Sequence, residues 1–225
     1  AFLAVCLLMA AWERAAARRT LLLSRTVRWP ANLGILALDT ALVRLIFSAA
    51  PYALALLAQA AGWGLLHAYP LPGWLKVALG VILLDLVIYL QHVMFHAVPA
   101  FWRFHMMHHA DLDFDFTTGG RFHPAEILLS VGIKMGAVAA LGAPPLAFLL
   151  FEVILNATSM FNHGNVSLPP ALDRVLRFVI VTPDMHRVHH SVVPGETNSD
   201  FGFNLPWWDR ILGTYRDRPA AGHDG

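Results

Sequence analysis

Residues 84–96 read LDLVIYLQHVMFH, an apolar stretch that carries His92 and His96 four positions apart. Side chains four apart on an α-helix share a face, so both imidazoles point to the same side. Two further clusters follow, HMMHH at 105–109 and HRVHH at 186–190. In a helix, each HxxHH cluster places its three rings within an arc of roughly 100°. Each cluster is therefore predicted to aim two or three imidazole nitrogens at one point.

The composition is that of a membrane protein. Of the 225 residues, 57% are hydrophobic and only 14% are charged, whereas soluble domains have about 25% charged residues. The formal net charge of +1 gives no basic field that would favour nucleic acid as a partner. The single cysteine, Cys6, excludes an intrachain disulfide and a thiolate metal site.

The hydropathy pattern predicts an all-α integral membrane protein with four to five transmembrane helices, since about 20 apolar residues cross a bilayer core. Pro51 interrupts residues 31–60, but each half alone is short, so we expect one long kinked helix there. The predicted spans are 1–12, 31–60, 74–97, 124–142 and 145–162. Residues 98–123 and 163–225 then form a helical cap on one side of the membrane.

The positive residues indicate the orientation. Thirteen of the sixteen Lys and Arg residues fall in segments on the same side as the predicted cap. The positive-inside rule makes that side cytoplasmic. All three histidine clusters lie on this side or at its membrane edge, so the site is expected at the cytoplasmic surface.

The number of clustered imidazoles indicates two metal ions. The clusters supply eight histidines, and His163 and His123 lie at the same membrane edge. A zinc site uses three or four protein ligands, so ten histidines are too many for one ion. Imidazole ligation suits Fe, Zn, Cu or Ni rather than Mg or Ca, and the protease motif HExxH is absent. His123 precedes Pro124, so it is either a ligand or a residue at the start of a helix.

Two carboxylates are candidate partners of the ligands. Asp85 recurs at helical spacing with His92, and Glu152 recurs in the same way with His163. A metal-bound imidazole usually donates its second N–H to a carboxylate or a carbonyl. Asp85 and Glu152 fit that role, and they fit equally well an interhelical hydrogen bond that only holds the bundle together.

The order HxxxH, HxxHH, HxxHH resembles the fatty acid hydroxylase/sterol desaturase superfamily of integral-membrane di-iron oxygenases, in particular its bacterial sterol desaturase members. Several flanking strings resemble that family too. They are LDLVIYLQHVMFH (84–96), WRFHMMHHAD (102–111), RFHPAE (121–126), FNHGNV (161–166), TPDMHRVHHS (182–191) and WWDRILGTY (207–215).

The resemblance implies a helical bundle with a cytosolic cap over two iron ions, which zinc can replace on purification. The ligands it implies are His92, His96, His105, His108, His109, His123, His163, His186, His189 and His190. Some family members carry a full second HxxxH before the last cluster, where this chain offers only His163. The implied reaction uses O2 to hydroxylate or desaturate a lipid, which is a fatty acyl chain, a sterol or hopanoid, a carotenoid or an ether lipid.

The resemblance also implies the surroundings of the enzyme. The haem-binding string HPGG is absent, so electrons are expected from a separate ferredoxin or cytochrome b5-like protein. The bacterial inner membrane is the expected location. The expected units are N-terminal transmembrane helices over 1–83, a catalytic domain over 84–215 and a tail over 216–225.

A membrane transporter or sensor that binds Zn or Cu is the alternative function. A transporter should carry ionisable groups along a path through several spans. The only candidates are Asp39, Arg44, Asp85, Lys134 and Glu152, and the clustered histidines lie on one side. This distribution favours the enzyme.

Overall fold

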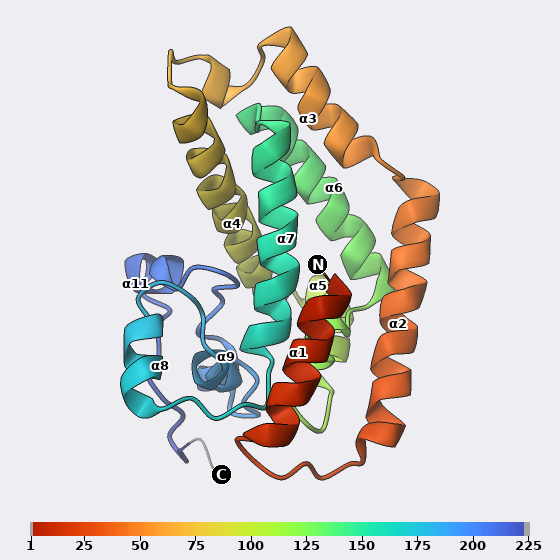
Figure 1. Cartoon of the computed structure of the whole chain (residues 1–225), viewed down its shortest axis with the longest axis vertical. Helices are drawn as coiled ribbons and strands as arrows, with labels where there is room; N and C mark the ends of the chain where they lie inside the picture. Colours follow the sequence, from red (N-terminus) through yellow and green to blue (C-terminus); the bar gives the residue numbers. More distant parts are fainter. Residues whose placement is uncertain (1, 223–225) are drawn as a thin grey trace.

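The computed structural model describes residues 2–222, in which the regular secondary structure is helical, apart from one isolated antiparallel bridge between Ala17 and Val166 (Figure 1). Four helices, α2, α4, α6 and α7, are long and apolar enough to cross a membrane. This confirms the predicted all-α membrane fold. The helices are α1 (Phe2–Ala15), α2 (Arg25–Ile46), α3 (Ala50–Ala61), α4 (Gly73–Ala97), α5 (Pro99–His109), α6 (Pro124–Leu141), α7 (Pro145–Asn162), α8 (Pro170–Leu176), α9 (Pro183–His189), α10 (Pro194–Thr197) and α11 (Trp207–Leu212).

The expectation of one kinked helix over residues 31–60 is wrong. The chain forms two helices there, α2 and α3, because Ser48 takes a left-handed φ of 47° and breaks the helical path. Pro51 lies in the first turn of α3, where its missing N–H costs nothing. With 12 residues, α3 is about 18 Å long, too short to cross a bilayer of about 30 Å.

The predicted first span corresponds to helix α1. Helix α1 has 14 residues, which at 1.5 Å per residue is about 21 Å. It lies along the lower half of α7 (Figure 1). Its buried Met9 packs with Met160 of α7 and with Phe116. Helix α1 therefore braces the half of the bundle that carries the histidines.

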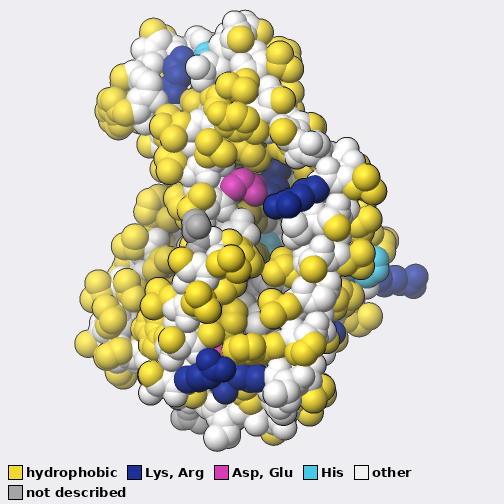
Figure 2. All heavy atoms as spheres, turned by 45° about the vertical axis from the view of Figure 1, so that its right-hand side comes forward, with side chains coloured by type: hydrophobic (Ala, Val, Ile, Leu, Met, Phe, Trp, Pro, Cys, Tyr) yellow, Lys and Arg dark blue, Asp and Glu magenta, His cyan; other side chains and the backbone are white. Residues whose placement is uncertain are grey.

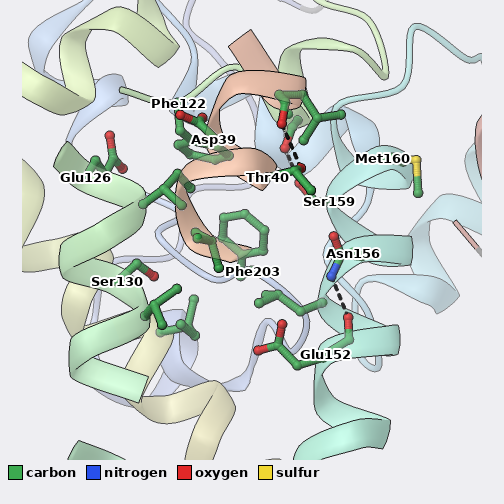
Figure 3. Close-up of a pocket in the computed structure, with 18 of the residues that line it drawn as sticks. Asp39, Thr40, Phe122, Glu126, Ser130, Glu152, Asn156, Ser159, Met160 and Phe203 are labelled. Carbon is green, nitrogen blue, oxygen red and sulfur yellow. Dashed lines mark hydrogen bonds between the residues drawn. The ribbon is translucent and has the colours of Figure 1, made fainter. Parts of the chain in front are cut away.

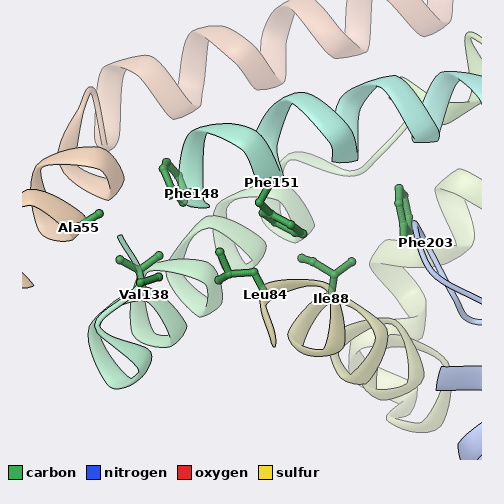
Figure 4. Close-up of a cluster of buried hydrophobic side chains, with 8 residues drawn as sticks. Ala55, Leu84, Ile88, Val138, Phe148, Phe151 and Phe203 are labelled. Atoms are coloured by element: carbon green, nitrogen blue, oxygen red, sulfur yellow. The ribbon is translucent and has the colours of Figure 1, made fainter. Parts of the chain in front are cut away.

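The apolar core lies where α4, α6 and α7 meet. Leu84 and Ile88 of α4 pack with Val138 of α6 and with Phe148 and Phe151 of α7 (Figure 4). Many outward-facing side chains are hydrophobic, and hydrophobic groups (yellow) are spread widely over the face drawn in Figure 2. Apolar residues that face outward as well as inward are typical of a bundle surrounded by lipid.

The α4–α7 contact depends on a small residue. A Cβ added at Gly80 of α4 would lie 2.8 Å from the Cβ of Ala147 of α7. Glycine therefore allows these two helices to approach closely, as small residues commonly do in membrane bundles. His92 and His96 lie in the last turns of α4 and His163 directly follows α7, so the two packed helices both lead into the site.

Ion pairs fix the loop after α5 to the N-terminal part of the chain. The guanidinium of Arg28 in α2 is buried and contacts the carboxylates of Asp111 at 2.7 Å and Asp115 at 2.6 Å. The carboxylate of Glu13 in α1 accepts hydrogen bonds from the backbone N–H of Phe116 and of Asn165. The N-terminal helices therefore hold the loops on either side of the histidines.

Candidate metal centre

Four segments bring the histidines together beneath the bundle. The lower end of α4 supplies the HxxxH pair, and the last five residues of α5, the helix that follows the turn at Val98, supply HMMHH. His163 is the residue that ends α7. Helix α9 supplies HRVHH; it begins at Pro183, and the side chain of Thr182 caps it by accepting from the N–H of Met185.

Nine of the ten predicted ligands form two groups. In each group the available nitrogen atoms all lie within 4.8 Å of one another, which is the arrangement of ligands around a metal ion. The first group is His92, His96, His105, His109 and His189, and the second is His108, His163, His186 and His190. Within residues 2–222, these histidine clusters are therefore positioned to hold metal.

Each HxxHH cluster contributes to both groups. His105 and His109 belong to the first group, whereas His108, between them in sequence, belongs to the second. In α9 the arrangement is reversed, since His186 and His190 belong to the second group and His189 to the first. Residues four apart thus share one site, and the residue three positions after the first serves the other. In the structure, two rings of each cluster therefore point to one group and the third ring points to the other.

Buried nitrogens without partners support metal binding. Five imidazole nitrogens in the two groups are buried and have no hydrogen-bond partner: Nε2 of His96, His109, His189 and His190, and Nδ1 of His186. Other ring nitrogens face each other, with His92 Nε2 3.1 Å from His105 Nε2 and His163 Nε2 3.1 Å from His108 Nε2. Buried polar atoms without partners are costly, and a cation in each group would satisfy the Nε2 lone pairs that converge there; His186 also faces its group with Nε2, 3.1 Å from Nε2 of His163.

The opposite ring nitrogens have oxygen partners. Four histidines lie with Nδ1 at a backbone carbonyl: His92 at Phe201 (2.8 Å), His189 at Ser199 (2.8 Å), His163 at Ser159 (2.7 Å) and His108 at Arg121 (3.2 Å). Donation from Nδ1–H leaves Nε2 unprotonated and free to bind a metal. The side chain of Asn198 lies 3.3 Å from Nδ1 of His96 in the same way.

Burial keeps the histidines uncharged. Desolvation, reinforced by neighbouring imidazoles, lowers the pKa of His105, His108, His109, His186, His189 and His190 well below 6.5. Desolvation also lowers the pKa of His163, to about 3. Neutral imidazole is the form that binds metal, so the cluster is ready to bind at neutral pH.

Three predicted residues lie away from the two groups. His123 caps α6, and its Nδ1 accepts from the N–H of Ala125. Asp85 accepts from Nε1 of Trp208 at 2.8 Å, and Glu152 contacts Nζ of Lys134 at 2.6 Å. Neither carboxylate hydrogen-bonds a histidine of the two groups in the structure.

Glu126 is the carboxylate that contacts a candidate ligand, and sequence reasoning missed it. Its Oε1 lies 2.7 Å from Nδ1 of His105, and both side chains are buried. Glu126 stands in the string RFHPAE, three residues after His123. An acidic residue in the first turn of a predicted membrane helix was the available signal.

A cavity of about 370 Å³ lies between α2, α4, α6 and α7 beside the first group. His92 and His105 line it, together with apolar side chains such as Phe122 and Phe203 (Figure 3). On the other side of the site, a second opening of about 510 Å³ reaches His96, His109 and His190. The histidines are thus accessible both from within the bundle and from the cap.

A model of the family described as fatty acid hydroxylase matches residues 77–214. The chain belongs to the fatty acid hydroxylase family. The matched segment contains all nine histidines of the two groups, so the family assignment and the geometry concern the same residues.

Known members of the family resemble this chain at moderate identity. The chain is 32% identical to ornithine lipid hydroxylase OlsE of Rhizobium tropici, over 75% of its own length and 51% of the relative. It is 30% identical to human cholesterol 25-hydroxylase, over 60% of the chain and 49% of the relative. The identity to human alkylglycerol monooxygenase is 28%, over 63% of the chain and 30% of the relative.

The chain thus spans about half the length of the first two relatives. No solved structure matches it. The names of the relatives describe lipid hydroxylases and monooxygenases, which supports an oxidoreductase.

Proposed function

We propose that this chain is a membrane-bound, non-haem di-iron enzyme that uses O2 and external electrons to hydroxylate or desaturate a C–H bond of a lipid. The observation that carries the proposal is the pair of adjacent groups of buried and partly buried histidines. Two sites that share the helices α5 and α9 suit two metal ions acting together. Nitrogen ligands favour iron over hard cations such as magnesium.

The proposed ligands are the nine histidines of the two groups, five for one ion and four for the other. The metal pair supplies O2 activation when bound. Residues of the chain hold the ligands in place, since carbonyls of Ser199 and Phe201 fix His189 and His92, and Glu126 fixes His105. Such partners usually tune both ligand orientation and metal affinity.

The cavity beside the first group is the proposed position of the lipid. Apolar side chains such as Phe122 and Phe203 line it beside His92 and His105, which suits a hydrocarbon segment next to the metal, and the position of the cavity between membrane helices suits entry from the bilayer. Relatives that act on ornithine lipid and cholesterol support a lipid substrate. The shared family does not decide among fatty acyl, sterol or hopanoid, carotenoid and ether lipids.

The remaining parts of the proposal concern the setting of the enzyme. We place the histidine side of the bundle in the cytoplasm of a bacterial cell, with the four long helices in the inner membrane. A separate ferredoxin or cytochrome b5-like protein delivers the electrons. Residues 84–215 form the catalytic domain, residues 1–83 are N-terminal membrane helices, and 216–225 are a tail, whose last three residues lie outside the described range.

Metal analysis with Mössbauer spectroscopy tests this proposal. Protein grown with iron-57 and purified in detergent should contain about two irons per chain, in a nitrogen-rich dinuclear signature that changes on reduction and exposure to O2. Replacing His108 or His189 with alanine should lower the metal content and abolish turnover. His67→Ala is the matched control, because His67 lies in the turn Leu65–His67 before α4, away from both groups.

Two results would contradict the proposal. The first is an unchanged metal content in both His108→Ala and His189→Ala. The second is iron-free protein that also fails to take up ferrous iron on reconstitution; stable zinc or copper in such protein would favour a metal transporter or sensor.

A further inference from the structure

The cavity beside the metal centre contains buried acceptors without donors. Asp39 of α2 is 4% exposed, and neither of its carboxylate oxygens has a hydrogen-bond partner. Asp39 lines the cavity on the α2 side, as Figure 3 shows. A carboxylate without a partner in such surroundings is strongly unfavourable. A ligand that donates to Asp39 would remove this cost.

Two other side chains present acceptors to the same cavity. Glu126 uses Oε1 for His105, and its Oε2 is buried without a partner. Gln91 donates from Nε2 to Ser130 at 3.0 Å, which leaves its Oε1 without a partner. Among the described residues that line this cavity, every buried side-chain polar atom without a partner is an oxygen acceptor. A ligand that fits these acceptors supplies hydrogens.

The charges around the cavity further restrict the ligand. Lys134 and Glu152 neutralise each other through an ion pair, and Figure 2 shows basic and acidic side chains close together in a hollow of the apolar surface. Arg44 lines the same cavity, but among the described residues neither Asp39 nor Glu126 pairs with a Lys or Arg side chain. An anionic headgroup would meet repulsion beside them, and a hydrocarbon chain would leave their oxygens unsatisfied. A primary ammonium group carries a positive charge and three N–H donors.

We propose that the cavity lined by Asp39, Glu126 and Gln91 binds the primary amino group of an amphiphilic lipid. This inference deepens the proposed function, on which it rests, by naming the substrate class. Asp39 is the positioning residue that receives the ammonium. The acyl chain lies along the apolar walls of the cavity, among side chains such as Leu36, Val131 and Leu155.

The position of the acceptors also restricts the site of oxidation. One oxygen of Glu126 contacts the candidate ligand His105 and the other is available to the cavity. His92 and His105 line the same cavity. An amino group held there lies beside the metal centre, so the oxidised carbon lies within a few bonds of the nitrogen rather than far along the acyl chain.

Lipid binding without turnover tests the inference. The full chain, loaded with metal and placed in phosphatidylcholine nanodiscs without reductant, is offered hexadecylamine, hexadecanol and hexadecyltrimethylammonium in competition, and native mass spectrometry measures which is retained. The alcohol offers one donor and no charge, and the trimethylammonium offers charge and no donor. We expect wild-type protein to prefer the primary amine by at least about tenfold.

The variant Asp39→Asn keeps the shape of the side chain and removes its charge. It should lower the preference for hexadecylamine by about tenfold. Asp217→Asn is the control, since Asp217 is exposed and pairs with Arg177 and Arg218 at the surface. It should keep the wild-type preference. Metal content is measured in each variant, so that loss of the site is distinguished from loss of the lipid.

Equal retention of the three amphiphiles by wild-type protein, or an undiminished amine preference in Asp39→Asn, would overturn the inference. If Asp39→Asn does not fold, the wild-type comparison alone decides. Failure of the proposed function gives a different result: amine preference in a protein that neither binds iron nor oxidises lipid. Hydroxylation of a lipid with no amine preference would support the enzyme and refute the amine site.

Discussion

Oε1 of Glu126 lies 2.7 Å from Nδ1 of His105, and both side chains are buried. The first turn of α6 is thereby joined to α5, which supplies three of the nine candidate ligands. The contact fixes the ring so that Nε2 of His105 faces the centre of the first group. Glu126 is also the only acidic residue in the first turn of α6.

Replacing Glu126 with glutamine should weaken metal retention by about ten- to a hundredfold, because a neutral amide holds the imidazole less firmly than a carboxylate does. Metal content measured after dialysis against a chelator checks this. Wild-type retention in the variant would show that the hydrogen bond to His105 does not tune the site.

Removing Asp85 should affect stability and leave metal binding intact. Its carboxylate accepts hydrogen bonds from Nε1 of Trp208 and from the N–H of Leu205, and so ties the C-terminal segment to α4. Asp85→Ala leaves both donors without this acceptor, at a cost of about 1–3 kcal/mol. A lower unfolding temperature with an unchanged metal-to-protein ratio is expected, whereas metal loss from folded protein would count against this assignment.

Acid should destabilise the metal-free protein. The pKa of His163 is lowered to about 3 in the fold, against 6.5 for an ordinary histidine, so below pH 6.5 the unfolded chain binds protons that the folded chain does not. The contribution of neutral His163 to the free energy of unfolding is therefore full above about pH 6.5, and it is lost as the pH falls toward 3. Chemical unfolding of apoprotein between pH 7.5 and 5 measures this, and a stability that stays flat or rises toward pH 5 would refute it.

Filling the space at Gly80 should separate α4 from α7. In Gly80→Ala the added Cβ would lie 2.8 Å from the Cβ of Ala147, and such overpacking costs about 1–3 kcal/mol. Gly132→Ala is the matched control, because a Cβ on that α6 glycine meets nothing within 4 Å. Thermal unfolding of the two variants in the same detergent should show a loss only for Gly80→Ala; equal behaviour would mean that the helices adjust freely.

The sequence predicted those features that depend on local spacing. Long apolar segments identified α4, α6 and α7, and the periodic histidines identified nine residues that the fold brings together. Helical spacing alone could not show that His108 and His189 serve the opposite group from their neighbours, because this depends on how α5 and α9 face each other. The same limit explains why helical spacing did not identify Glu126, because its contact with His105 arises only when α6 packs beside α5.

Other features depended on backbone conformation or on competing partners. The left-handed Ser48 ends α2 before Pro51 is reached, and no residue type in that stretch requires such a conformation. His123 lies at the start of α6, where the N–H of Ala125 occupies its Nδ1. Asp85 has a helical spacing to His92 but hydrogen-bonds Trp208, which is distant in sequence.

The division of each HxxHH cluster between two groups means that neither site can be assembled alone. Helices α5 and α9 each supply ligands to both groups, so an ion that orders one group also orders most of the other. The second ion then binds to ligands whose conformational entropy has already been lost. Metal uptake should therefore be cooperative, and chains that hold a single ion should be scarce at every stage of a titration.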